Sequence, residues 1–194
     1  MSYQSPISLH SCHSLPTPYS LLVTGINKGA TYDDQHHVFW VNDPVFLTHQ
    51  HRLYRWVEYH FHIPSEHKLH GDEYEAEIHY VFVLIHSKDD IPRSIHVCDG
   101  DTKNESILVL GRVIRDKALH QNLAYVQVQL PRDYFEYDGT LTTGNLAPVR
   151  WVVGSRSLAM NRNEIATVAK HQRPLQPLND RIVLQTRERP FDPE

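Results

Sequence analysis

The residues best suited to chemistry are histidines and acids gathered in two neighbouring stretches of the chain. The first stretch contains His60, His62 and Glu66, and the second contains Glu77 and His79. Successive side chains of a β-strand point to opposite faces, so His60 and His62 share one face and lie about 7 Å apart along the backbone. Both imidazoles can therefore reach one ion.

Turn residues between the two stretches indicate how His79 joins this pair. Pro64, Gly71 and Asp72 favour a reversal of the chain, so we expect the two strands to pair antiparallel and His79 to lie opposite the first two histidines. Three nitrogen ligands with a fourth position left to water define a catalytic zinc site, whereas a structural site closes with four protein ligands. No cysteine in the sequence lies near enough to close it.

Two other interpretations of these residues stay open at this point. In a chain with 15 histidines, a His-x-His spacing alone is more often a solvated polar face, and only the third histidine and the interleaved acids favour a metal. The spacing His60-x-His62-x₃-Glu66 also begins the iron or manganese site of a cupin barrel, in which Glu66 would be a ligand of an oxygenase or isomerase. The glycines and the distant His-Asn pair of a cupin are not found in the sequence.

The elements that must position these residues are predicted to be mainly strands. Short β-branched and aromatic runs alternate with turn residues at about ten-residue spacing, which is typical of a β-rich domain. One short helix is expected over Glu164–Lys170, capped by Asn161 or Asn163. The first 20 residues and the last ten contain several prolines and are expected to be irregular surface coil. Strands are expected over 37–41, 53–62, 74–86, 106–115, 123–130, 147–153 and 181–185.

Length and composition limit the class of protein. A chain of 194 residues with 40% hydrophobic and 22% charged residues predicts one globular domain over 1–194. The net charge of -4 gives no reason to expect nucleic acid as a partner. Apolar runs such as 81–85 are far shorter than the roughly 20 residues that cross a bilayer. The first residues lack a basic region followed by an apolar run, so we expect a cytoplasmic protein, with monomer or homodimer left open and with Cys12 and Cys98 as two idle thiols.

Five segments, in the same order, resemble the α-class carbonic anhydrases over most of the chain. The resemblance implies a β-rich fold with a mainly antiparallel, twisted central sheet and few short helices. It also implies that a Zn²⁺ cofactor hydrates CO₂ reversibly to bicarbonate and a proton. The segments are Gln4-Ser5-Pro6-Ile7, His60-Phe61-His62 with Ser65-Glu66-His67, Tyr74 to His79, Tyr137 to Thr143 with Trp151 behind it, and Arg173 to Pro177.

The same resemblance implies a role for each matching residue. His60, His62 and His79 would hold the zinc, and Glu77 and Glu58 would accept the free N–H groups of the ligand imidazoles. Thr142 would accept a hydrogen bond from zinc-bound hydroxide and donate its own proton to Glu66. An apolar pocket for CO₂ would be lined by residues for which ordinary core packing is an equal explanation when each is taken singly: Val81, Val109, Leu141, Thr143, Val149 and Trp151.

His37 stands where the family often carries its proton-shuttling histidine. The register is open because His36 is adjacent, and on a strand only one of two neighbours faces the cavity. A surface histidine without a role is an alternative of about equal weight.

The sequence also departs from the family pattern at several positions. It begins almost at Gln4-Ser5-Pro6, so the segment that usually precedes this motif is expected to be absent. Gly144-Asn145 replaces Pro-Pro, Trp40 replaces a small polar residue, and Glu58 replaces glutamine. A catalytically weak or inactive binding protein of the same fold is therefore the alternative function. Such members have generally lost a metal histidine, and all three are present here.

Overall fold

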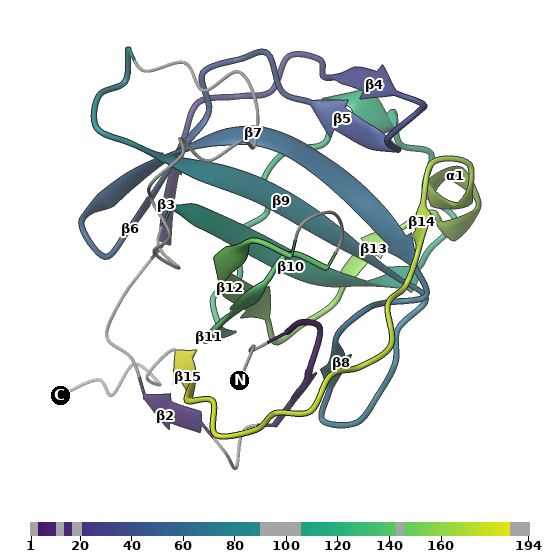
Figure 1. Cartoon of the computed structure of the whole chain (residues 1–194). Helices are drawn as coiled ribbons and strands as arrows, with labels where there is room; N and C mark the ends of the chain where they lie inside the picture. Colours follow the sequence, from purple (N-terminus) through teal and green to yellow (C-terminus); the bar gives the residue numbers. More distant parts are fainter. Residues whose placement is uncertain (1–3, 11–13, 17–20, 90–105, 143–145, 187–194) are drawn as a thin grey trace, which may run out of the picture.

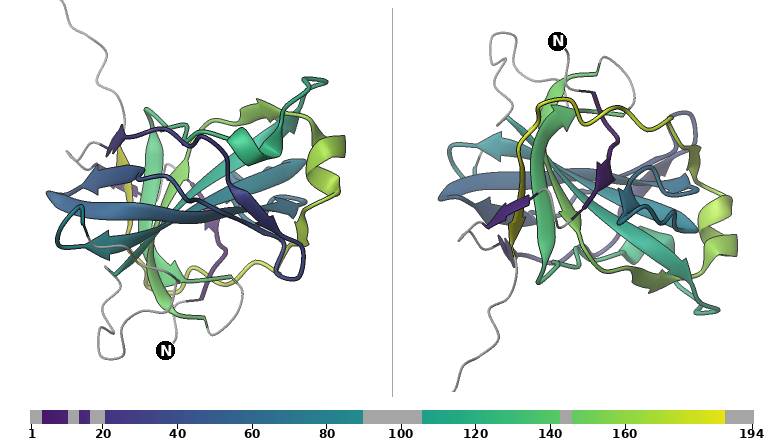
Figure 2. Two further views of the ribbon diagram at one scale, coloured as in Figure 1. Left: turned by 90° about the horizontal axis from the view of Figure 1, so that it is seen from above. Right: turned by 90° about the horizontal axis from the view of Figure 1, so that it is seen from below.

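The computed structural model describes residues 4–10, 14–16, 21–89, 106–142 and 146–186, and the structural statements below concern this part of the chain. One twisted and curled sheet dominates it, as Figure 1 and the two turned views of Figure 2 show, in the order β2-β15-β11-β12-β10-β9-β7-β5-β4. Its centre is an antiparallel trio of long strands. They are β7 (Arg52–Ile63), β9 (Ala76–Ile85) and β10 (Ile107–Asp116).

The remaining strands extend this centre on both sides. The hairpin of β11 (Tyr134–Thr140) and β12 (Pro148–Gly154) joins β10 through a parallel β12–β10 pairing. The other elements of the sheet are β2 (Ser14–Pro16), β3 (Leu21–Thr24), β4 (Thr31–Asp33), β5 (Val38–Trp40), β6 (Phe46–His49), β13 (Leu158–Met160), β14 (Lys170–His171) and β15 (Val183–Thr186). A separate small sheet pairs β1 (Ser8–Leu9) with β8 (Lys68–Leu69), and the one regular α-helix of the described residues is α1 (Arg162–Ala166).

Alternation along the strands divides the core between the two faces of the sheet. On β9, Tyr80 and Phe82 belong to an aromatic cluster on one face, where they pack with Trp56 and Tyr59. Val81 belongs to a second cluster on the other face. His79 and Glu77 share the face of Val81, so the candidate site is built on the second, mainly aliphatic face.

Six of the seven expected strands are confirmed with small shifts of their ends, but the strand expected over 123–130 is wrong. The segment begins with a single 3₁₀ turn, Leu123–Tyr125, and then runs without a strand partner. Its carbonyl groups are bonded mainly by side chains instead, with one backbone bond from Ala30 N–H to the Ala124 carbonyl at 2.8 Å. Tyr59 donates to the Leu123 carbonyl at 2.6 Å, and the Asn27 amide donates to the carbonyls of Ala124 and Val126, each at 3.0 Å.

The beginning of the described chain differs from the expectation of surface coil. Ile7 and Leu9 are fully buried, and β2 pairs with the last strand, β15. Of the last ten residues, 187–194 lie outside the described residues. Asn161 caps α1 as expected: its side-chain oxygen accepts a hydrogen bond from the backbone N–H of Asn163 at 2.9 Å. The helix ends at Ala166 rather than Lys170, because Lys170 already pairs in β14 with β7.

Two further expectations concern the thiols and membranes. Cys12 and Cys98 lie outside the described residues. Among the described helices, none has the length and apolar character needed to cross a membrane.

Candidate metal centre

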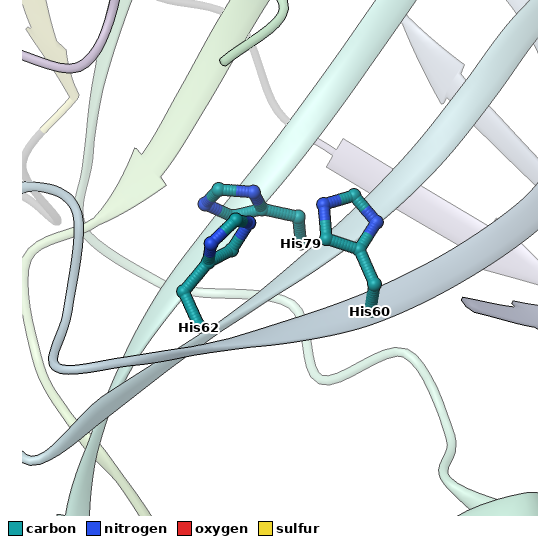
Figure 3. Close-up of side chains that lie close together, drawn as sticks. All are labelled: His60, His62 and His79. Carbon is teal, nitrogen blue, oxygen red and sulfur yellow. The ribbon is translucent and has the colours of Figure 1, made fainter. Parts of the chain in front are cut away.

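The antiparallel register of β7 and β9 brings three histidines together. His60 lies directly opposite His79, and His62 lies opposite Glu77. The ring centroids are 5.1 Å apart for His60 and His62, 5.2 Å for His60 and His79, and 4.7 Å for His62 and His79. Figure 3 shows the three rings gathered over the two strands. One ring nitrogen of each histidine lies within 4.8 Å of the other two, so the three residues form a set that could hold a metal ion.

A different partner holds the outer nitrogen of each ring. His60 Nδ1 lies 3.2 Å from Glu58 Oε1, and His79 Nε2 lies 3.0 Å from Glu77 Oε1. His62 Nδ1 lies 3.2 Å from the carbonyl oxygen of His171 on β14. These distances would leave Nε2 of His60 and His62 and Nδ1 of His79 for a ligand. His62 Nε2 is buried without a hydrogen-bond partner in the described part of the chain. His60 Nδ1 and His79 Nε2 also lack one there, so their carboxylate neighbours lie within ion-pair distance but not in hydrogen-bond geometry.

Burial sets the charge of the site. It lowers the pKa of His60 and His62 well below the usual 6.5, so both rings are neutral at neutral pH, as metal ligands must be. Burial alone would raise the pKa of Glu77, but His67 and His79 outweigh it and hold that pKa well below 4.5. Burial raises the pKa of Glu58 to about 7, against the opposing charge of Lys170.

Glu77 begins a buried polar chain that the expected roles do not include. Its Oε2 accepts the backbone N–H of His67 at 2.8 Å, and its Oε1 lies 2.8 Å from His67 Nδ1. His67 Nε2 lies 2.6 Å from the Tyr137 hydroxyl oxygen, and that hydroxyl donates to Ser5 Oγ at 3.1 Å. The sequence analysis gave no role to His67, Tyr137 or Ser5. All three lie within segments that resemble the α-class carbonic anhydrases, and this resemblance could have indicated that they lie near the site.

Glu66 and Thr142 are both buried, but no hydrogen bond joins them among the described residues. Glu66 Oε1 accepts the backbone N–H of Arg173 at 2.8 Å. Its Oε2 lies 3.9 Å from His79 Nδ1 and has no hydrogen-bond partner in this part of the structure. The expected Thr142-to-Glu66 bond therefore stays a prediction.

His36 and His37 are placed differently from the expectation. Both lie in the turn between β4 and β5, both are exposed, and His37 has a positive φ of 53°. His37 Nδ1 lies 3.0 Å from the Tyr32 hydroxyl, and His36 Nδ1 lies 2.8 Å from Asp33 Oδ2. The argument that strand alternation lets only one of them face a cavity is wrong, because neither residue is on a strand.

Five of the six residues expected to form an apolar wall belong to or pack against one hydrophobic cluster, and one of them, Trp151, contacts a candidate metal ligand. Val81, Val109, Val149 and Trp151 are buried members of one hydrophobic cluster, and Leu141 packs against it. The Trp151 ring is 4.8 Å from the ring of His79. Thr143, the sixth expected member, lies outside the described residues.

Comparison with known proteins gives consistent relatives. No family model matches the chain. It is 26% identical over 154 residues to a carbonic anhydrase of Nostoc, covering 72% of this chain and 57% of the relative, so the chain spans little more than half of that protein. It is 24% identical over 204 residues to alpha carbonic anhydrase 3 of Arabidopsis thaliana, covering 93% of this chain and 73% of the relative. It is 26% identical over 195 residues to a carbonic anhydrase of Neisseria gonorrhoeae, covering 94% and 77%.

Solved structures show the same fold. An α-carbonic anhydrase of Thermovibrio ammonificans in complex with sulfanilamide matches with a TM-score of 0.67 and 24% identity, over 94% of this chain and 86% of that one. Carbonic anhydrase Cah3 of Chlamydomonas reinhardtii in complex with acetazolamide matches with a TM-score of 0.69 and 21% identity. The match covers 95% of this chain and 90% of that one. Dioscorin in complex with ascorbate matches with a TM-score of 0.73 and 18% identity. The match covers 94% of this chain and 85% of that one.

The curled sheet with its buried three-histidine cluster is thus the fold of the α-carbonic anhydrases. The relatives and the structural neighbours together support the assignment of this chain to the α-class carbonic anhydrase family. The cupin alternative is wrong, because the fold is not a cupin barrel.

Proposed function

We propose that this protein is a zinc enzyme that hydrates CO₂ to bicarbonate and a proton. The observation that carries the proposal is the convergence of three buried histidine nitrogens, one from each of His60, His62 and His79. The names of the curated relatives support carbonic anhydrase activity in general. The choice of zinc and the role of each residue belong to this proposal.

The residues present fit a catalytic zinc ion. Three neutral imidazoles are the donor set of such a site, and a fourth position remains for water. The orphaned, buried His62 Nε2 fits a metal ligand, since a buried polar atom without a partner is otherwise unfavourable. When bound there, Zn²⁺ would lower the pKa of a coordinated water to about 7, the value known for carbonic anhydrases themselves, and so supply a nucleophile at neutral pH.

The chain's own residues would prepare this centre. Glu77, Glu58 and the His171 carbonyl fix which nitrogen of each histidine is free, as partners of metal-bound histidines usually do. The apolar wall around Trp151 excludes competing water and suits CO₂, which has no dipole. Thr142 and Glu66 would align the attacking oxygen, and His37 would carry the released proton to solvent.

The test is the substitution His79→Ala, with His120→Ala as the matched control because the His120 side chain is 94% exposed. We expect His79→Ala to lose both bound zinc and CO₂ hydration, since two imidazoles on one strand hold zinc far more weakly than three on two. The control should keep both. Metal analysis and a stopped-flow hydration assay measure the two quantities.

The outcomes separate the proposed enzyme from the alternatives. One zinc per chain with CO₂ hydration in the unaltered protein supports the proposal. Zinc without hydration favours a binding protein of the same fold, and full zinc occupancy in His79→Ala would overturn the ligand assignment.

A further inference from the structure

The carboxylate of Glu77 lies between two imidazoles, and His67 supplies most of its contacts. Glu77 Oε1 is 2.8 Å from His67 Nδ1 and 3.0 Å from His79 Nε2, and Oε2 accepts the backbone N–H of His67 at 2.8 Å. A fully buried carboxylate is unfavourable without such partners. Since one residue supplies two of these three contacts, the place of Glu77 beside His79 depends on the place of His67.

Tyr137 on β11 holds the His67 ring at its other nitrogen. His67 Nε2 lies 2.6 Å from the Tyr137 hydroxyl oxygen, and the ring centroids of His67 and Trp151 are 4.8 Å apart. Both His67 and Tyr137 are buried. The partner at one nitrogen of an imidazole decides how the other nitrogen is used. The Tyr137 hydroxyl therefore fixes the ring of His67 and, through it, the carboxylate of Glu77.

The opening segment, residues 4–9, contacts this pair from two directions. The Tyr137 hydroxyl donates to Ser5 Oγ at 3.1 Å. The strand β8 begins directly after His67 and pairs in parallel with β1 of the opening segment, with Ser8 opposite Lys68 (Figure 1). The opening segment is therefore bonded both to Tyr137 and to the strand that follows His67.

We propose that His67 and Tyr137 are positioning residues that connect the opening segment to the metal centre. When the segment is docked, Tyr137 and β8 hold His67, and His67 holds Glu77 beside His79. Docking of the segment and zinc binding then strengthen each other. The part concerning zinc rests on the proposed function. The part concerning His67 and Glu77 does not, and it can be measured without metal.

The first measurement is amide hydrogen exchange at His67 in metal-free Tyr137→Phe, because this N–H donates to Glu77. We expect exchange there to become about tenfold faster or more, relative to the core amides of β10, as the contact opens locally. Tyr59→Phe is the matched control. Tyr59 is also fully buried and its hydroxyl also forms a 2.6 Å hydrogen bond, to the Leu123 carbonyl, but it lies in the aromatic cluster on the other face. The control should leave exchange at His67 unchanged.

The second measurement is the coupling to zinc. If docking strengthens zinc binding, zinc must strengthen docking by the same factor. The amides of His70 and Gln176 report docking, because they donate to the carbonyls of Leu9 and Pro6, each at 2.8 Å. In the unaltered protein we expect zinc to slow exchange at both amides about tenfold.

Tyr137→Phe should remove this coupling. We expect its zinc affinity, measured by competition with a chelator, to fall about tenfold, and the zinc-dependent protection of His70 and Gln176 to disappear. Tyr59→Phe should change neither quantity. A loss of stability alone would not remove the effect of zinc on these two amides.

The outcomes separate this proposal from the proposed function. Exchange at His67 that is unchanged in Tyr137→Phe, or that rises only in parallel with the β10 amides, overturns the positioning role without reference to zinc. Bound zinc that leaves exchange at His70 and Gln176 unaltered overturns the coupling. An unaltered protein that binds no zinc overturns the proposed function and the coupling together, and the first measurement still decides the role of His67.

Conservative variants at His67 test whether the effect passes through Glu77. The amide nitrogen of His67→Asn takes the place of Nδ1, so this variant keeps a donor to Glu77 and loses the contact with Tyr137, whereas His67→Leu loses both. We expect zinc affinity to be about tenfold higher in His67→Asn than in His67→Leu. Equal affinities would show that Glu77 does not transmit the effect.

Ser5→Ala provides a second variant in case Tyr137→Phe does not fold. It removes the hydroxyl at the far end of the chain of contacts and leaves Tyr137 beside His67. The same local increase of exchange at His67, smaller in size, supports the proposal. Its absence in a folded variant argues against it.

Discussion

At the residue scale, an oxygen atom lies beside one ring nitrogen of each of the three histidines. Two of these oxygens belong to carboxylates and the third to a backbone carbonyl. Glu58 comes from the same strand as His60, Glu77 from the same strand as His79, and the His171 carbonyl from β14. Alternation alone predicts the first two contacts, because an acid two residues away shares the face of its histidine. The third could not be predicted, since it depends on a two-residue strand that only the tertiary fold brings beside β7.

The titration of the site predicts how acid affects the metal-free protein. His60 and His62 have folded-state pKa values below the unfolded 6.5, so the unfolded chain binds more protons as the pH falls below 6.5 and stability is lost. Glu58 acts in the opposite direction between its unfolded pKa of 4.5 and its folded pKa of about 7. Two groups against one give a net loss of stability as the pH falls from 6.5 towards 4.5, on the order of 1 kcal/mol per pH unit.

Urea unfolding of the metal-free protein at several pH values measures this slope. In Glu58→Gln the opposing group is removed, and we expect the slope to become roughly twice as steep. A free energy of unfolding that is independent of pH between 4.5 and 6.5 in both proteins would show that the histidines are not buried in the neutral form.

The proton-transfer role of His37 is a second prediction at this scale. If His37 exports the proton, His37→Ala should lower kcat in dilute buffer by about tenfold or more and leave kcat/KM nearly unchanged. Concentrated imidazole buffer should restore most of the loss. His36→Ala is the matched variant from the same exposed turn, and unchanged kcat in both variants would remove this turn from the proton route.

At the element scale, the sequence predicts the two strands that carry the histidines. It does not predict strands whose formation depends on contacts with residues distant in the sequence. The β7–β9 pairing follows from period-two patterning and from turn residues between the two strands. By contrast, β11 was not expected, because its sequence Tyr134–Thr140 contains Glu136, Asp138 and Gly139, which strands usually disfavour. Glu136 and Asp138 are accommodated there by Arg150, a partner that no local pattern reveals.

The neighbouring strand β10 gives a prediction about packing behind a ligand. Gly111 is the register partner of His79, and a Cβ at this position would lie only 2.8 Å from Glu77 Oε1, the oxygen that faces His79 Nε2. Gly111→Ala should displace this carboxylate and weaken zinc binding about 10- to 100-fold. Competition with a chelator measures the zinc affinity.

A double-mutant cycle controls for general disruption by this methyl group. If Gly111→Ala acts through Glu77, it should weaken zinc binding little further in a Glu77→Ala background. Equal effects in both backgrounds would assign the loss to another cause.

At the scale of the whole molecule, the curled sheet is closed by segments that are distant in the sequence. The Arg181 side chain donates to the Gln4 carbonyl, and the backbone N–H of Gln176 donates to the Pro6 carbonyl at 2.8 Å. The Ser5 hydroxyl meets Tyr137. Prolines made this opening segment look like surface coil, and its burial could not be predicted because its partners across the fold lie about 60 residues away in β8 and more than 130 residues away in the case of Tyr137, Gln176 and Arg181.

The last prediction tests whether the opening segment belongs to the core. Ile7 is fully buried in the cluster that contains Val81 and Trp151, whereas Leu22 on β3 is 59% exposed. Ile7→Ala should lower the free energy of unfolding by about 2–5 kcal/mol through lost burial and a cavity, and Leu22→Ala should change it by less than about 0.5 kcal/mol. Chemical denaturation of both variants measures the difference. Equal, small changes would mean that the sheet closes without the opening segment, and the contacts of Ser5 with Tyr137 would then be no part of what supports the metal centre.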